Sequence, residues 1–204
     1  LFNTNEDKNI YSCYTGAKEA ADCILPTQLK NLSILPASIN LVGAEVELIS
    51  QDKREKRLKT ILRSVKENFH YILIDCPPSL GILTINSLTA ADSVLIPLQC
   101  EYFAMEGLAQ LIQTVRKVKK NLNRELFIEG LLLTMYDRRN RLTHSVASEI
   151  QKHFGEQVYD TVIPRNVRLS ESPSHGQTII EYDPGCSGAK AYKPAVPFFF
   201  GLIM

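Results

Sequence analysis

The residues of this sequence best placed to do chemistry follow the apolar run Tyr71-Ile72-Leu73-Ile74, which ends at Asp75. Consecutive apolar residues predict a strand buried on both faces of a parallel sheet, and Pro77 and Pro78 can neither continue a helix nor donate to a ladder. Asp75 is therefore predicted at the carboxyl end of a strand, where open α/β sheets bind ligands. A carboxylate there could hold Mg²⁺ against nucleotide phosphates, directly or through water. The alternative is a strand that simply ends in an aspartate at a turn.

The composition is that of an ordinary soluble globular protein. The 204 residues are 45% hydrophobic and 22% charged, and 23 Lys and Arg against 22 Asp and Glu give a net charge of +1. Bulk charge therefore gives no reason to expect nucleic-acid binding, and a DNA contact would need a local basic patch. The five cysteines contain no C-x-x-C pair, which is typical of a reducing cytoplasm. No apolar stretch is long enough to span a bilayer, so we expect no membrane association.

Strand and helix patterns alternate along the chain. Apolar runs predict strands at residues 32–35, 71–75, 93–98, 128–136 and 158–163, with a short one at 178–180. Helical spacing predicts helices at residues 10–23, 44–64, 84–90, 105–120 and 143–154. This order predicts an α/β fold, a doubly wound and mainly parallel sheet with helices on both faces. Without repeats or a low-complexity linker, we expect one domain over residues 1–204.

The two ends of the chain differ from that pattern. Pro194 and Pro197 are expected to break a last helix after Ala189–Tyr192, which leaves residues 193–204 as a divergent apolar tail. The first residue is Leu1, and not Met, so we expect the chain to begin inside a longer protein.

Several blocks of the sequence resemble the ParA/Soj family of partition ATPases, which are deviant Walker-type P-loop NTPases of the MinD/ParA superfamily. The blocks follow one another in family order, at Leu32–Ala37, Gly43–Leu48, Asp75–Glu101, Gly130–Asp137 and Val162–Gly176. The resemblance implies the P-loop NTPase-like fold, with ATP and Mg²⁺ as cofactors.

An ATPase of this class needs a phosphate cradle, in which glycine N–H groups, a lysine and a Ser or Thr surround the phosphates. The motif G-x-x-x-x-G-K-[ST] does not occur in the 204 residues. Family members carry this loop in their first strand–helix unit, so the resemblance implies that the N-terminal P-loop unit is missing from this chain. We therefore expect the chain alone to be inactive, with its catalytic residues unknown.

The resemblance also assigns nucleotide-binding roles to five residues. Asp75 would bind Mg²⁺ through water, and Pro77 belongs to the loop that follows it. Pro164 and Asn166 match the part of the family loop that packs on the adenine, and Met135 ends the strand beside that loop. From the residues alone, Met135 is equally well explained as a core filler, and Pro164 as a turn former.

Three basic residues are candidates for non-specific contacts with DNA phosphates: Arg165, Arg168 and Lys190. Family members often carry further basic residues where this chain reads Asp183-Pro184-Gly185-Cys186-Ser187-Gly188, which contains none. Each lost phosphate contact lowers the affinity for DNA, so we expect this chain to bind DNA more weakly than those family members. The alternative for the two arginines is a surface ion pair with Glu171 or Asp160.

The function implied by the resemblance is chromosome or plasmid partition. The intact protein would form an ATP-dependent homodimer, bind DNA non-specifically, hydrolyse ATP when a ParB-like partner stimulates it, and lie in the cytoplasm with the nucleoid. One alternative is a non-catalytic fragment or scaffold that binds a partition partner without ATP turnover. A MinD-like membrane-associated ATPase is another, but Pro194 and Pro197 oppose the basic amphipathic C-terminal helix that it would need. A Ser–His–Asp hydrolase lacks its G-x-S-x-G motif here.

Overall fold

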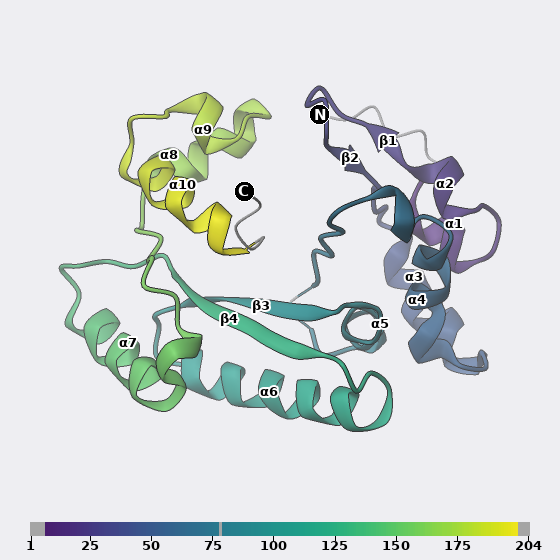
Figure 1. Ribbon diagram of the computed structural model, residues 1–204, viewed down its shortest axis with the longest axis horizontal. Coiled ribbons are helices and arrows are strands. Elements are labelled where there is room, and N and C mark those ends of the chain that lie inside the picture. Colours follow the sequence, from purple (N-terminus) through teal and green to yellow (C-terminus); the bar gives the residue numbers. More distant parts are fainter. Residues whose placement is uncertain (1–6, 78, 200–204) are drawn as a thin grey trace. The chain divides into compact units, whose positions relative to one another are not determined.

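The computed structural model describes residues 7–77 and 79–199, with side chains up to residue 194 (Figure 1). The chain divides into two compact units. The first comprises Leu1–Asp92 and Thr114–Leu126, and the second comprises Ser93–Gln113 and Phe127–Met204, each as far as its residues are described.

The second unit is built on two parallel strands, β3 (Ser93–Gln99) and β4 (Phe127–Thr134), which run side by side in Figure 1. They pair along their whole length, with one irregularity after Val94. The helix α6 (Ala104–Asn121) begins in this unit, and α7 (Arg141–Phe154) follows β4. These elements confirm the strands predicted at 93–98 and 128–136, the helices predicted at 105–120 and 143–154, and the α/β class.

Apolar side chains from all four elements form the core of this unit. Its buried members are Ile96, Cys100, Leu108, Ile112, Leu131, Leu133, Val146, Ile150 and Val158. In β4, the consecutive residues Leu131, Leu132 and Leu133 are 0%, 4% and 5% exposed. Side chains of successive strand residues point to opposite faces, so β4 is covered on both faces, as in buried parallel sheets.

Local signals fix the ends of α7. The side chain of Asn140 accepts a hydrogen bond from the backbone N–H of Leu142 at 2.9 Å and so caps the N-terminus. Gly155 follows the last residue with φ +51°, a left-handed value that favours glycine. Gly155 comes directly after the predicted helix end at residue 154.

The strand predicted at 158–163 follows β4 without pairing continuously. The N–H of Tyr159 donates to the carbonyl of Leu131 at 3.0 Å, and that of Ile163 donates to Leu133 at 2.8 Å. Four residues of this segment therefore advance along only two residues of β4. The extra residues loop out of the ladder, so the segment forms isolated parallel bridges where a strand was predicted.

The first unit consists of short elements. They are α1 (Ile10–Tyr14), α2 (Ala20–Cys23), β1 (Leu25–Pro26), β2 (Ser33–Ile34), α3 (Leu41–Glu47), α4 (Arg57–Arg63) and α5 (Ile82–Ala90), with the 3₁₀ turns η1 (Leu48–Ser50), η2 (Arg54–Lys56) and η3 (Lys66–Asn68). The predicted helix at 10–23 is interrupted because the chain turns at Gly16, where φ is +79°. The predicted helix at 44–64 is likewise divided, with Lys53 in the left-handed region at φ +54°. The helix predicted at 84–90 is α5, and the strand predicted at 32–35 is β2, antiparallel to β1.

A buried asparagine joins the pieces of that divided helix to α5. Asn86 is 0% exposed, and its side-chain oxygen accepts from the N–H of Leu58 at 3.0 Å. Its amide nitrogen donates to the carbonyl of Arg54 at 2.8 Å. Buried amides need such partners, so Asn86 ties η2 and α4 to α5.

The strand predicted at 71–75 is absent, and this corrects the central sequence prediction. Residues 71–77 form neither helix nor strand. Tyr71, Ile72 and Leu73 are 45%, 37% and 77% exposed, and Asp75 is also exposed. The described sheets are the pairs β1–β2 and β3–β4, and neither includes this segment. An apolar run becomes a strand only where a neighbouring strand accepts its backbone hydrogen bonds.

The C-terminal part of the second unit is helical. It contains α8 (Val167–Glu171), the turn η5 (Ser172–His175), α9 (Ile179–Tyr182) and α10 (Ser187–Phe199). The strand predicted at 178–180 is wrong because Thr178 and Glu181 form a capping box that begins α9. The helix break predicted at Pro194 is also wrong, since α10 continues to Phe199. A proline removes one backbone donor, and Pro194 does so at an exposed position. Residues 200–204 of the predicted tail lie outside the described residues.

Candidate nucleotide and nucleic-acid site

Met135, the first residue after β4, has a strained backbone conformation. Met135 has φ +52°, a left-handed value that is uncommon for a residue with a side chain. Hydrogen bonds hold the next residue, because the N–H of Tyr136 donates to Ile163 and its carbonyl accepts from Arg165, both at 3.0 Å. Such strain costs on the order of 1–3 kcal/mol and occurs preferentially at ligand sites. Met135 thus has a fixed conformation at the carboxyl end of a parallel strand.

Met135 and Pro164 lie on adjoining segments. Pro164 and Tyr136 form an isolated parallel bridge, and both Met135 and Pro164 are half-buried. The structure therefore places Met135, at the end of the strand, beside Pro164 of the loop that the resemblance matched to the adenine. An apolar side chain and an apolar ring beside backbone polar groups suit a nucleotide base.

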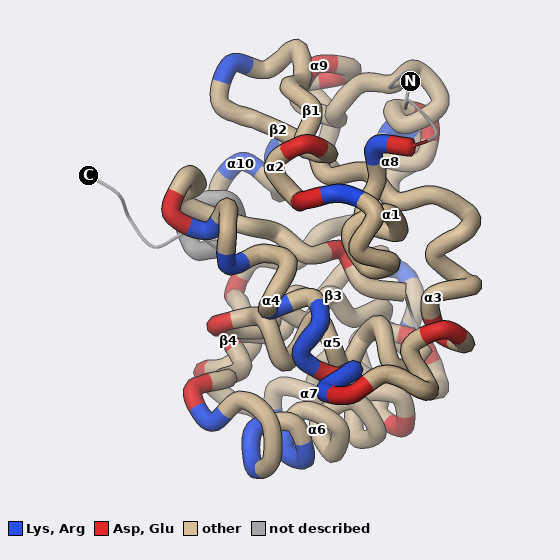
Figure 2. Tube along the Cα trace, turned by 90° about the vertical axis from the view of Figure 1, so that its right-hand side faces the viewer, with Lys and Arg blue, Asp and Glu red and all other residues tan. Residues whose placement is uncertain are grey.

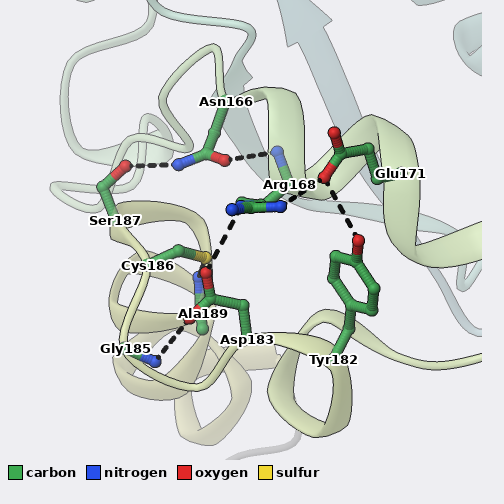
Figure 3. Close-up of polar contacts among 9 residues, drawn as sticks. All are labelled: Asn166, Arg168, Glu171, Tyr182, Asp183, Gly185, Cys186, Ser187 and Ala189. Carbon is green, nitrogen blue, oxygen red and sulfur yellow. Dashed lines mark hydrogen bonds and ion pairs between the residues drawn. The ribbon is translucent and has the colours of Figure 1, made fainter.

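Asn166 has a structural role that the sequence did not predict. Its side-chain oxygen accepts from the N–H of Arg168 at 2.8 Å and caps α8, while its amide nitrogen donates to the hydroxyl of Ser187 at 2.7 Å (Figure 3). Asn166 therefore links the start of α8 to the start of α10, directly after the Pro164 bridge.

Asp75 and Pro77 belong to the first unit and are both exposed. Pro78 lies outside the described residues. Within the described ranges, no group of three or more His, Cys, Asp or Glu side chains could hold a metal ion. Asp75 can supply one protein ligand, which suits a Mg²⁺ ion that keeps several waters and binds mainly to phosphate oxygens.

Arg168 lies in an acidic network, shown in Figure 3. Its guanidinium donates to Glu171 at 2.9 Å and lies 3.6 Å from Asp183, and the hydroxyl of Tyr182 also donates to Glu171, at 3.2 Å. The hydrogen bond to Glu171 raises the pKa of Arg168 above its usual range. The ion pair with Glu171 that was considered as the alternative is thus present.

The other two residues predicted to contact DNA are Arg165 and Lys190. Arg165 lies 3.5 Å from Glu101 and keeps 56% of its side chain exposed, so its ion pair is neither the Glu171 nor the Asp160 pair that was considered. Lys190 is exposed on α10. Exposed ion pairs contribute little stability, so these charges are open to exchange for phosphate.

Sequence reasoning missed a basic loop directly after Tyr136. We call residues 137–141 the arginine loop, because its exposed cations are Arg138, Arg139 and Arg141. Arg139 is 92% exposed. The backbone N–H of Arg139, then its guanidinium, lower the pKa of Asp137, and Arg165 contributes as well. The signal was present in the sequence as three arginines just beyond a predicted strand.

A second basic group lies at the end of α6, in the first unit. Its exposed members are Arg116, Lys117, Lys119 and Lys120, and Figure 2 shows Lys and Arg gathered there. Cations at a helix C-terminus also interact favourably with the helix dipole, so their position has a structural explanation.

None of the helices found in the described ranges combines the length and the apolar character needed to cross a bilayer.

Comparisons with known proteins identify the family of this chain. A family model described as an AAA domain matches residues 1–128. The chain is 56% identical over 183 residues to the sporulation initiation inhibitor protein Soj of Bacillus subtilis, which covers 90% of this chain and 72% of that protein. It is 47% identical over 191 residues to the chromosome partitioning protein ParA of Caulobacter vibrioides, covering 93% and 72%.

Solved structures give the same fold. Cobyrinic acid a,c-diamide synthase from Mycobacterium smegmatis, with bound ATP analog and magnesium, is 31% identical with a TM-score of 0.77, over 95% of this chain and 73% of that one. The fold is thus that of the α/β P-loop NTPases. Within that class, the chain belongs to the ParA/Soj family.

Proposed function

We propose that this chain acts in ParA-type partition, in which a nucleotide-controlled protein associates with DNA and moves replicated chromosome or plasmid copies apart. The observation that carries the proposal is the 56% identity to Soj over 90% of the chain. The arrangement of Met135 beside Pro164 at the carboxyl end of β4 supports it, because open α/β sheets bind nucleotides at that edge.

We expect ATP and Mg²⁺ as cofactors. In the second unit, Pro164 and Asn166 would pack on the adenine, with Met135 beside them. In the first unit, Asp75 would hold the metal through water, and Pro77 would shape the loop after it. The metal would neutralise phosphate charge. Because the 204 residues contain no G-x-x-x-x-G-K-[ST] loop, we expect the chain alone to show no MgATP binding by calorimetry. Micromolar binding would contradict the importance of that loop.

The proposed DNA surface combines the predicted cations Arg165, Arg168 and Lys190 with the arginine loop. The side chain of Arg139 is 92% exposed, whereas that of Arg168 is 55% exposed and is held by two carboxylates, so we expect Arg139 to contribute more. Dimerisation with ATP and stimulation by a ParB-like partner belong to the same proposal. Membership of the family supports both.

Salt dependence of DNA binding tests this surface. Short duplex DNA of random sequence, carrying a fluorophore, is titrated with the chain at several salt concentrations, and the anisotropy gives the affinity. Replacing one phosphate-contacting arginine should lower the slope of log K against log salt by about one unit. We expect this for Arg139→Ala. The matched control is Arg63→Ala, an exposed arginine of α4, which should leave the slope unchanged. Salt-independent binding by the wild type would refute the DNA surface.

A scaffold that binds a partition partner without ATP turnover is the second candidate function. This alternative stays open, because the motif G-x-x-x-x-G-K-[ST] does not occur within these 204 residues. The two candidates differ in one readout when the chain is extended by the phosphate-loop unit of the family, because a scaffold would bind a ParB-like partner equally well with and without MgATP. Partner binding that requires MgATP would exclude the scaffold.

A further inference from the structure

His144, on the first turn of α7, uses both of its ring nitrogens. Its Nε2 lies 2.7 Å from the carbonyl oxygen of Arg138, and its Nδ1 lies 3.1 Å from the hydroxyl of Tyr136. A carbonyl oxygen only accepts hydrogen bonds, so Nε2 donates and Nδ1 accepts from the tyrosine hydroxyl. The two rings also meet edge-on, with centroids 5.6 Å apart and planes at 84°. Two residues, Tyr136 and Arg138, therefore hold the imidazole through two hydrogen bonds and one ring contact.

The two partners of His144 belong to different parts of the candidate site. Tyr136 follows the strained Met135 and bridges to Pro164, whereas Arg138 is the first cation of the arginine loop. One side chain on α7 thus connects the end of β4 to the backbone of the loop. The connection lies within the second unit.

The arginine loop is anchored at its ends as well. The carboxylate of Asp137 accepts from the N–H of Arg139 at 3.0 Å, and Asn140 caps α7 through Leu142. Both of these contacts are local, since they join residues two apart. The imidazole of His144 supplies side-chain bonds that reach across the loop, to residues six and eight positions away.

We propose that His144 is a positioning residue that holds the arginine loop against the end of β4, so that its guanidinium groups are presented together to the phosphates of a nucleic acid. The presentation to phosphates rests on the proposed function, whereas the hold on the loop does not. A loop ordered beforehand loses less conformational entropy when it binds. His144 itself touches no phosphate in this scheme.

Trypsin measures the hold on the loop, because it cuts after arginine and requires local opening of the chain. In His144→Ala, cleavage after Arg138 and Arg139 should become faster by between about twofold and tenfold, the range expected for one or two exposed hydrogen bonds. Mass spectrometry of early products locates the cuts. The matched control is His153→Ala, which removes the exposed histidine of the same helix that pairs with Glu149. It should be cut in the loop at the wild-type rate.

Two further variants separate the bonds. His144→Gln keeps an amide donor that can reach the carbonyl of Arg138, and we expect it to restore part of the protection. Tyr136→Phe removes only the hydroxyl, and we expect a smaller increase in cleavage than for His144→Ala. A residue that contributed only to global stability would not show rescue by glutamine together with cuts confined to the loop. Wild-type cleavage of His144→Ala would overturn the proposal.

The duplex anisotropy assay then tests whether positioning of the arginine loop by His144 strengthens DNA binding. We expect His144→Ala to weaken binding severalfold in the wild type, and less when Arg139 is already replaced by alanine, because the two residues then act on the same contact. Equal effects in both backgrounds would refute the presentation of arginines. If the wild type does not bind DNA while His144→Ala still opens the loop, the proposed function fails and the positioning role stands.

Discussion

Two runs of consecutive apolar residues in this chain adopt different structures, one as a buried strand and the other as an exposed segment outside any strand. Leu131-Leu132-Leu133 lies in β4 and is at most 5% exposed, whereas Leu73 in Ile72-Leu73-Ile74 is 77% exposed and belongs to no strand. The difference is in their neighbours. β4 pairs with β3 on one side and with the segment after Val158 on the other. The described sheets offer the 72–74 run no such partner.

This comparison shows that an apolar run alone does not form a strand. It becomes a strand where a neighbouring strand supplies partners for its backbone hydrogen bonds. An isolated extended segment leaves its N–H and C=O groups to water, and it cannot bury alternate faces. In the run at 72–74 the side chains of Ile72 and Leu73 stay exposed, whereas Ile74 packs against a core cluster of the first unit.

The largest effect is expected from truncating one leucine in each run. Leu131→Ala should lower the free energy of unfolding by about 2–5 kcal/mol, because Leu131 is fully buried in the core. Leu73→Ala should change it by roughly 0.5 kcal/mol or less, because the side chain is exposed. Urea unfolding followed by circular dichroism measures both. Equal losses for the two variants would mean that the runs are buried alike.

The next test concerns the close packing beside β4. A Cβ on Gly130 would lie 2.5 Å from Cε2 of Tyr159 and 3.2 Å from the carbonyl oxygen of Gln157. Gly130→Ala should therefore cost about 1–3 kcal/mol of unfolding free energy through overpacking. Gly107→Ala is the matched control, because nothing lies within 4 Å of its Cβ position in α6, and it should stabilise by up to about 1 kcal/mol. A neutral Gly130→Ala would show that the neighbouring segment packs loosely.

A third apolar run, at 178–180, became a helix because of its local cap. The hydroxyl of Thr178 accepts from the N–H of Glu181 at 3.3 Å, and the carboxylate of Glu181 accepts from the N–H of Thr178 at 3.0 Å. Thr178→Ala removes half of this capping box and should cost about 1 kcal/mol. Urea unfolding measures the loss, and amide exchange at 179–182 locates it. Unchanged exchange there would show that the cap does not decide the helix.

The smallest effect is a titration. Hydrogen bonds from the backbone N–H of Thr178, then from its hydroxyl, lower the pKa of Glu181. A lowered folded-state pKa means that this stabilisation is present above the ordinary glutamate value and is lost as pH falls through the folded-state value. NMR titration of the carboxyl group should give a pKa below the ordinary one in the wild type and closer to it in Thr178→Ala. An ordinary pKa in the wild type would contradict these bonds.

The sequence predicted correctly those elements whose signals are local or whose partners lie nearby in the chain. The helix α7 had an Asn cap, a helical pattern and a terminal glycine, and β3 and β4 are adjacent strands joined by one helix. The predictions that were wrong at 71–75 and 178–180 depended on partners or caps that periodicity does not encode.

The sequence likewise predicted only some features of the candidate site. The bridge between Tyr136 and Pro164 places Met135 and Pro164 on adjoining segments, while their contact with a nucleotide stays a prediction. The acidic partners of Arg168 include Glu171, which was considered as the alternative. The left-handed backbone of Met135, the capping role of Asn166 and the two bonds of His144 could not be derived from residue types. They depend on how separate segments meet.

Amide hydrogen exchange tests the central claim most directly, because it reports the backbone partners of both runs in one experiment. The account predicts strong protection of the amides of Leu131, Leu132 and Leu133 and rapid exchange at Ile72, Leu73 and Ile74. Protection of the 72–74 amides comparable to that of β4 would contradict it, because that run would then have strand partners in this chain.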